Sequence, residues 1–139
     1  MLIFILTLAY PNSAKADTNS SGPDIRVLGE KLTGEEIQQA FANVRDDARV
    51  QDDAKTRAVN QWHSDGRFIS RWKNDSDAGE VTGNWRVSND MRCVTISKGV
   101  PQRIGKESCG VIFRRGDEYL SFNGDGSIHG IHTLTPLSN

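Results

Sequence analysis

The chain is poor in the residue types that build metal sites and nucleic-acid surfaces. Its 139 residues include only two cysteines, Cys93 and Cys109, and three histidines. So few soft ligands do not predict a structural metal site, and we expect no cofactor. The 17 basic residues are balanced by 18 acidic ones, for a formal net charge of −1. Nucleic-acid-binding proteins usually carry a basic excess that neutralises phosphates, so no nucleic-acid partner is expected.

Long hydrophobic runs are also missing, and the one apolar stretch, residues 2–10, is far shorter than the roughly 20 residues that span a bilayer. It has the length of the apolar part of an export signal, and the small-x-small pattern at residues 14–16 matches a signal-peptidase site. We therefore expect a signal peptide over residues 1–16, cut before Asp17, although no Lys or Arg precedes the run. The alternative is an apolar N-terminal strand that is retained. The residue directly after the cut is not the cysteine that a bacterial lipid anchor requires. We therefore expect a periplasmic or secreted protein without a stable membrane anchor.

The remaining chain has the length of one domain, with a flexible tail at residues 17–31 and a β-rich domain at residues 32–139. Thirteen glycines, several beside Asp or Asn, separate short apolar runs. This pattern is typical of many turns that join short strands. It predicts a mainly β fold of about seven strands, either a small antiparallel up-and-down β-barrel or a two-layer β-sandwich. One N-terminal α-helix is expected to pack on it.

The helix has a clear start signal. Thr33 can cap it, and Glu36, three residues later, can return a hydrogen bond to the Thr33 amide, which is a capping box. Leu32 and Ile37 match the hydrophobic staple that accompanies such a box. We expect the helix to end near Asn43 and to pack its apolar face on the sheet, because a helix this short is marginal alone.

The segment after the helix is ambiguous. Residues 44–57 are highly charged, and we expect a short edge strand or a loop there, with a helix over residues 46–58 as the alternative. Apolar alternation and turn residues then predict regular strands. They lie at residues 58–63, 67–73, 80–87, 91–97, 107–114, 118–122 and 127–134.

The two cysteines predict a structural disulfide, since an exported chain enters an oxidising compartment and an even count leaves no free thiol. Cys93 and Cys109 lie on neighbouring predicted strands. If they face each other directly, the centre of the connecting loop falls at Pro101, where a missing amide hydrogen is tolerated. The bond would then hold together a hairpin with a long loop.

Two patterns suggest metal sites only superficially. His129 and His132 are three residues apart, so on a strand they point to opposite faces unless a bulge intervenes, and we expect solvated or singly hydrogen-bonded histidines. Residues 123–127 resemble the start of a calcium loop. The required Gly and bidentate Glu positions are instead Ile128 and Leu134, so a hairpin turn is the better interpretation.

No catalytic constellation is apparent. The chain has no Gly-x-Ser-x-Gly elbow, and most aspartates near glycines fall in predicted turns, where they bond local amides. We therefore expect no enzyme. The alternative is a small hydrolase whose site would combine turn carboxylates with His63 or His132.

The three tryptophans, Trp62, Trp72 and Trp85, are candidate ligand-lining residues, because aromatic side chains inside a small barrel can line a cavity. The alternative is that they fill the core, since Trp buries a large area.

Several segments together resemble a family of small exported proteins of alphaproteobacteria, a domain of unknown function. The resemblance covers nearly all of the chain after residue 16. It is carried by LTGEEI at 32–37, WHSDG at 62–66, TGNWRV at 82–87, RGDEY at 115–119 and the two cysteines. Each motif is structural, so the resemblance implies no functional residue.

The sequence thus favours an exported, non-catalytic binding domain that holds a small ligand or an envelope protein. A more specific alternative is an inhibitor of a secreted hydrolase such as lysozyme, with residues 98–106 as the inserting loop. The third hypothesis is the small hydrolase.

Overall fold

The computed structural model describes residues 28–138 of the chain. The expected signal peptide and residues 17–27 of the expected tail lie outside the described residues. The last part of that tail belongs to the domain, because Leu28 is buried and Glu30 and Lys31 pair with Arg114 and Phe113.

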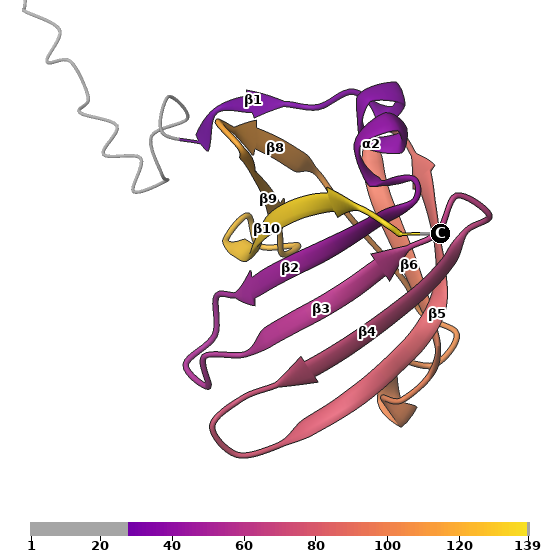
Figure 1. Ribbon diagram of the computed structural model, residues 1–139, viewed down its shortest axis with the longest axis vertical. Helices are drawn as coiled ribbons and strands as arrows, with labels where there is room; N and C mark the ends of the chain where they lie inside the picture. The colour runs from indigo at the N-terminus through magenta and orange to yellow at the C-terminus, as the bar shows by residue number, and fades with distance from the viewer. Residues whose placement is uncertain (1–27, 139) are drawn as a thin grey trace, which may run out of the picture.

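The described chain is mainly β, with one α-helix, as predicted. All strand pairs are antiparallel, in one ten-stranded sheet of order β1-β8-β9-β10-β2-β3-β4-β5-β6-β7, which curls into a half-barrel (Figure 1). In chain order the elements are β1 (Glu30–Lys31), α2 (Gly34–Phe41), β2 (Val44–Val50), β3 (Arg57–Trp62), β4 (Arg67–Lys73), β5 (Ala78–Ser88), β6 (Met91–Lys98), the 3-10 helix η1 (Pro101–Arg103), β7 (Glu107–Gly110), β8 (Ile112–Arg115), β9 (Glu118–Phe122) and β10 (Ile128–Pro136).

The predicted number of about seven strands was wrong, because residues 28–138 form ten. The short β1 is one addition. The charged segment after the helix is another, because it forms β2, which pairs with β10 and β3 on its two sides instead of lying at an edge. The third addition comes from the predicted strand 107–114, which is divided at Val111 into β7 and β8.

This division connects β7, at one end of the sheet order, with β8, the strand next to the other end. β7 pairs with β6, whereas β8 pairs with β9, although only Val111 separates them in the chain. A Cβ atom on Gly110 would lie 2.8 Å from the Phe122 carbonyl oxygen, so only a glycine permits this close approach to β9 without a shift. The covalent chain through Val111 therefore connects the β6–β7 pair of strands to the β8–β9 pair.

The capping box at the start of α2 is present as predicted. The Glu36 amide donates to Thr33 Oγ1 at 3.2 Å, and the Thr33 amide donates to Glu36 Oε1 at 3.1 Å. The helix ends at Phe41, before the predicted Asn43, which has a left-handed φ of 64°. The Gly34 amide donates to Asp90 Oδ1 at 2.6 Å, which ties the helix start to the turn between β5 and β6.

α2 lies over one end of the half-barrel, at the top of Figure 1, and its buried Ile37 and Phe41 enter the core there. The main apolar cluster consists of Leu32, Ile37, Phe41, Trp62, Phe68, Val81, Trp85, Ile96 and Ile112. In the described part of the chain, no helix has the length and apolar character needed to cross a membrane.

The predicted disulfide joins Cys93 to Cys109, which face each other directly across β6 and β7. The loop between these strands contains η1, which starts at Pro101. The predicted hairpin, its register and its loop centre are therefore confirmed.

Candidate functional site

The buried polar side chains of the described residues all belong to strands, and several of them alternate with residues that face outward. On β2, for example, Asp46 and Ala48 are buried, whereas Asp47 and Arg49 are exposed. The full set is Asp46, Asn60, Ser70, Arg92, Ser121 and His132. Register places Asp46 opposite Asn60 and Asn60 opposite Ser70, so β2, β3 and β4 contribute one polar row to the interior.

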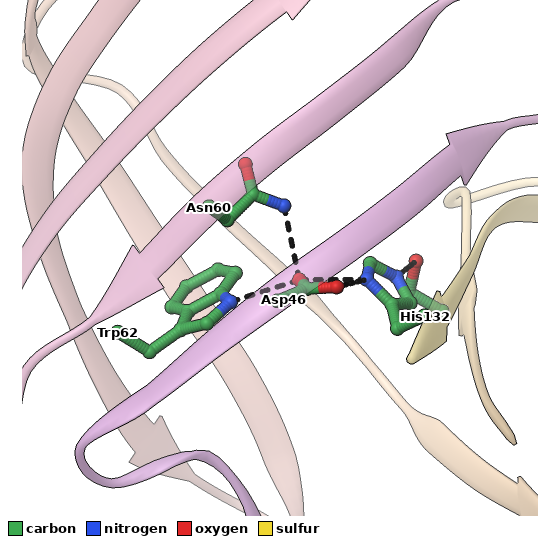
Figure 2. Close-up of polar contacts among 5 residues, drawn as sticks. Asp46, Asn60, Trp62 and His132 are labelled. Atoms are coloured by element: carbon green, nitrogen blue, oxygen red, sulfur yellow. Dashed lines mark hydrogen bonds and ion pairs between the residues drawn. The ribbon is translucent and has the colours of Figure 1, made fainter. Parts of the chain in front are cut away.

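Asp46 is the centre of a hydrogen-bond network (Figure 2). Its carboxylate is fully buried and accepts from Asn60 Nδ2 at 2.9 Å, Trp62 Nε1 at 2.9 Å and His132 Nδ1 at 2.8 Å. Burial by itself raises the pKa of Asp46, but the charge of His132 and these hydrogen bonds outweigh it and lower the pKa below the usual value. The carboxylate is therefore ionised and fully partnered at neutral pH.

His132 links this network to Ser121. Its Nδ1 lies 2.8 Å from Asp46 Oδ2 and its Nε2 lies 2.8 Å from the Ser121 hydroxyl oxygen, so one imidazole ring bridges the two side chains. The prediction of solvated or singly hydrogen-bonded histidines was thus wrong for His132, because β10 turns it toward the interior, where β2 supplies a carboxylate. His129 is exposed and makes one hydrogen bond, to Asn123 Oδ1 at 3.0 Å.

A cavity of about 580 Å³ occupies the interior of the half-barrel. This volume lies within the usual range for pockets that enclose a small organic molecule. Its walls combine apolar and aromatic side chains, among them Phe68, Val81, Val94 and Ile96, with polar ones. The polar lining residues are Asn60, Ser70, Arg92, Ser121 and His132, together with several at the mouth.

The two ends of the cavity differ. Phe41 of α2 packs at one end, against Trp62 and beside Arg92. At the other end the lining comes from the loops that connect β2 to β3, β4 to β5, β6 to β7 and β9 to β10, through Thr56, Asn74, Arg103 and Asn123. The loop over residues 98–106, expected as an inserting element, therefore borders the cavity mouth, where Gly105 is hydrogen-bonded to Ile96 O at 3.0 Å.

The structure separates the three candidate tryptophans. Trp62 and Trp72 line the cavity, and Trp72 lies against Gly79, where a Cβ atom would come within 2.9 Å of the indole ring. Trp85 does not line it. Its indole is buried in the apolar cluster and donates to the His63 carbonyl oxygen at 2.8 Å.

Arg92 is the most unusual side chain of the cavity. It is only 9% exposed, and its guanidinium carbon lies 4.2 Å from the centre of the Trp62 ring and 4.7 Å from that of Phe41. Nη1 is buried without a hydrogen-bond partner among the described residues. Burial lowers the pKa of Arg92 to about 10, and the charge of Asp46 opposes this shift. The guanidinium therefore stays protonated at neutral pH.

The sequence analysis missed Arg92, Asp46 and Ser121 as site residues. The inward position of Arg92 could have been predicted, because Arg92, Val94 and Ile96 are two residues apart on one strand and therefore lie on the same face. For Asp46 and Ser121, the partners come from distant segments, and no local pattern identifies them.

Ser121, His132 and Asp46 have the hydrogen-bond order of a nucleophile, a base and a carboxylate that orients the base. Gly130 faces Ser121 across β9 and β10, and a Cβ atom there would lie 3.0 Å from His132 Nε2. Its missing side chain keeps Ser121 and His132 open to the cavity. β9 is paired on both sides, so the amides around Ser121 are engaged in the sheet rather than pointing at a reacting carbonyl.

Metal binding has no support in the described residues. Their one cluster of three possible ligands is Cys93, Glu107 and Cys109. Both sulfur atoms of this cluster are joined in the disulfide and cannot act as thiolates.

The fold and the cavity define a class, a small half-barrel domain with an aromatic and partly polar interior. Comparison with known proteins adds no relative, since no protein-family model, curated protein or solved structure matches the chain. Its function is therefore argued from the residues of the half-barrel.

Proposed function

We propose that this chain is an exported, non-catalytic binding domain that holds a small, largely apolar molecule inside the half-barrel. The observation that carries this proposal is the cavity of about 580 Å³, lined by aromatic and aliphatic side chains with a few convergent polar groups. Ligand pockets characteristically combine these features.

Small interior residues support a binding role. Ala48 faces Ala58 across β2 and β3, and both line the cavity. A domain built only for stability fills such positions with larger aliphatic side chains, because unfilled volume costs packing free energy. The small side chains in this row leave the room that a ligand requires.

Export remains part of the proposal. The expected signal peptide and the resemblance to exported proteins favour a periplasmic or secreted location. The disulfide between Cys93 and Cys109 is compatible with an oxidising compartment.

Fluorescence of a neutral apolar probe tests the binding role. We expect N-phenylnaphthylamine to bind the purified protein saturably, with enhanced and blue-shifted emission. Ala58→Leu adds bulk to the cavity wall and is expected to weaken probe binding by about tenfold or more, since a filled pocket cannot enclose the probe. Val59→Leu, one residue along and facing outward, is the matched control and should bind as the wild type does.

The result that contradicts this role is equally clear. Absent probe binding by a folded wild-type protein, or equal binding by the Ala58→Leu and Val59→Leu variants, would show that the half-barrel interior does not hold the ligand. Thermal melting of each variant verifies that it is folded.

A second candidate function, a small esterase, is favoured by the hydrogen bonds from Ser121 to His132 and from His132 to Asp46. In this reaction the Ser121 hydroxyl gives its proton to His132 Nε2 while Oγ attacks the ester carbonyl. His132 then returns the proton to the departing alcohol, and water hydrolyses the acyl-serine.

Release of nitrophenol from p-nitrophenyl butyrate distinguishes the two functions. An esterase would lose its activity on Ser121→Ala while still binding the neutral probe. A rate with wild-type protein equal to that of Ser121→Ala would remove the second candidate and leave the binding role intact.

A further inference from the structure

We infer that the ligand is a monocarboxylate with an apolar body, and that its carboxylate binds the Arg92 guanidinium at the helix-covered end of the cavity. This inference rests on the proposed binding function and specifies the chemistry of its ligand.

The first step concerns charge within the half-barrel. Asp46 and Arg92 are buried charged side chains of the interior. Asp46 accepts hydrogen bonds from three side chains, on Asn60, Trp62 and His132. Arg92 Nη1 has no hydrogen-bond partner in the described part of the chain, and Arg92 lines the cavity. An anionic ligand group that reaches the guanidinium from the cavity would therefore supply the acceptor that the described side chains do not.

The second step concerns what the surroundings of Arg92 supply. The Phe41 and Trp62 rings stabilise the cation through their faces, with the guanidinium carbon 4.7 Å and 4.2 Å from the ring centres. They provide no oxygen acceptor for the N–H groups. A buried charged group without such an acceptor is costly, and an anion in the cavity removes that cost.

The third step concerns the kind of anion. A carboxylate accepts the planar, charge-assisted hydrogen bonds that a guanidinium donates. Arg92 is one cation whose Nη1 has no hydrogen-bond partner among the described residues, so it matches a ligand with one negative charge. A dianion such as a phosphate monoester would leave one charge uncompensated beside the ionised Asp46, whose charge already acts on Arg92.

The fourth step concerns the rest of the ligand. Arg92 lies near the start of β6, beside Phe41 of α2, so the carboxylate end would point away from the mouth. The body would extend past Phe68, Trp72 and Val94 toward the loops. The cavity of about 580 Å³ has room for either an aliphatic chain or a fused aromatic ring.

Displacement of bound N-phenylnaphthylamine by matched compounds tests this inference. Dodecanoate and naphthoate are the anionic competitors, dodecanol and naphthylmethanol are their neutral counterparts, and dodecyltrimethylammonium reverses the charge. For at least one pair we expect the carboxylate to compete about tenfold or more better than its neutral counterpart, because only it forms charge-assisted hydrogen bonds. The cation should compete least.

Two variants assign the preference to Arg92. Arg92→Met keeps comparable volume without charge, and in this variant the carboxylate and its neutral counterpart should compete equally within about threefold, each measured against the variant's own affinity for the probe. Arg92→Lys keeps the charge and should retain part of the preference. If Arg92→Met fails to fold, the carboxylate preference of Arg92→Lys is compared with that of the wild type instead.

The possible failures are distinguishable. Loss of neutral-probe binding by the wild type contradicts the proposed function itself. Normal probe binding with equal competition by acid and alcohol in both pairs overturns only the carboxylate inference. A carboxylate preference that survives in Arg92→Met overturns the assignment to Arg92.

Discussion

Replacing Asp46 with asparagine tests whether the interior network stabilises the fold. Asp46 accepts hydrogen bonds from Asn60, Trp62 and His132, and all of these groups are buried or half-buried. Asparagine has one carbonyl oxygen, and its amide group is a donor. All three donors meet the same oxygen, Oδ2, so an asparagine carbonyl oxygen in that place still accepts from them, but the bonds are no longer charge-assisted.

The magnitude follows from these contacts. A hydrogen bond to a charged group stabilises by about 1.5–3 kcal/mol and one between neutral groups by about 0.5–1.5 kcal/mol, so each bond weakens by about 1 kcal/mol. Three bonds weakened by about 1 kcal/mol each predict that Asp46→Asn lowers the free energy of unfolding by about 3 kcal/mol.

Asp47→Asn is the matched control. Asp47 is the next residue on β2 but faces outward, and its carboxylate pairs with Arg45 at 3.1 Å with both side chains about half exposed. Exposed ion pairs contribute at most about 1 kcal/mol. The two variants carry the same chemical change, so they differ only in the face of the sheet that the residue occupies.

Urea unfolding at neutral pH, followed by tryptophan fluorescence, gives both free energies and their denaturant slopes. If Asp46→Asn were destabilised by no more than about 1 kcal/mol beyond Asp47→Asn, the network would not hold the interior as argued. Should Asp46→Asn be unfolded in water, Asn60→Ala provides a milder test, because it leaves Asp46 with the donors on Trp62 and His132.

Three further predictions concern pH, the disulfide and the helix. The folded-state pKa of Asp46 is lowered, so its stabilisation is complete above the unfolded value near 4 and is lost as pH falls through the folded pKa. The difference in unfolding free energy between the wild type and Asp46→Asn should thus narrow as the pH falls below about 4, and a difference that widens in acid would contradict this sign. Replacing Cys93 and Cys109 together by alanine should lower the free energy of unfolding by about 3 kcal/mol, because the bond closes a loop of sequence separation 16, and an equally stable reduced protein would refute this. Thr33→Ala should cost about 1 kcal/mol by removing the cap on the Glu36 amide, whereas Thr33→Ser should cost little, and equal stabilities of the two in the same urea experiment would argue against the cap.

The parts of the fold that could be predicted from the sequence are those with local causes. The capping box involves residues three apart, and the disulfide hairpin follows from two cysteines on consecutive strands. The division at Val111 could not be predicted, because it depends on a change of pairing partner from β6 to β9. β2 was ambiguous because its inward position 46 is a carboxylate, which hides the apolar alternation that normally identifies a strand.

The candidate site was harder to predict, for the same reason. Asp46 and His132 are 86 residues apart in the chain, and neither has a local partner that marks it as buried. Only the closure of β10 onto β2 turns a charged residue and a histidine into one network. Trp62, Trp72 and Trp85 were equal candidates because their size limits them to the interior or an interface, and no local pattern distinguishes Trp85, which does not line the cavity, from the other two.

The disulfide has a role beyond stability if Arg92 anchors the ligand. β7 is the last strand in the sheet order and pairs only with β6, through four residue pairs. Cys93 and Cys109 form the pair directly beside Arg92 and Gly110 in this ladder. The covalent bond therefore fixes the wall at the position of the buried guanidinium, where an edge strand would otherwise separate most easily. A cavity that keeps an unpaired charge and small side chains gives up packing free energy, and the disulfide offsets part of that loss at the neighbouring residue pair of the sheet.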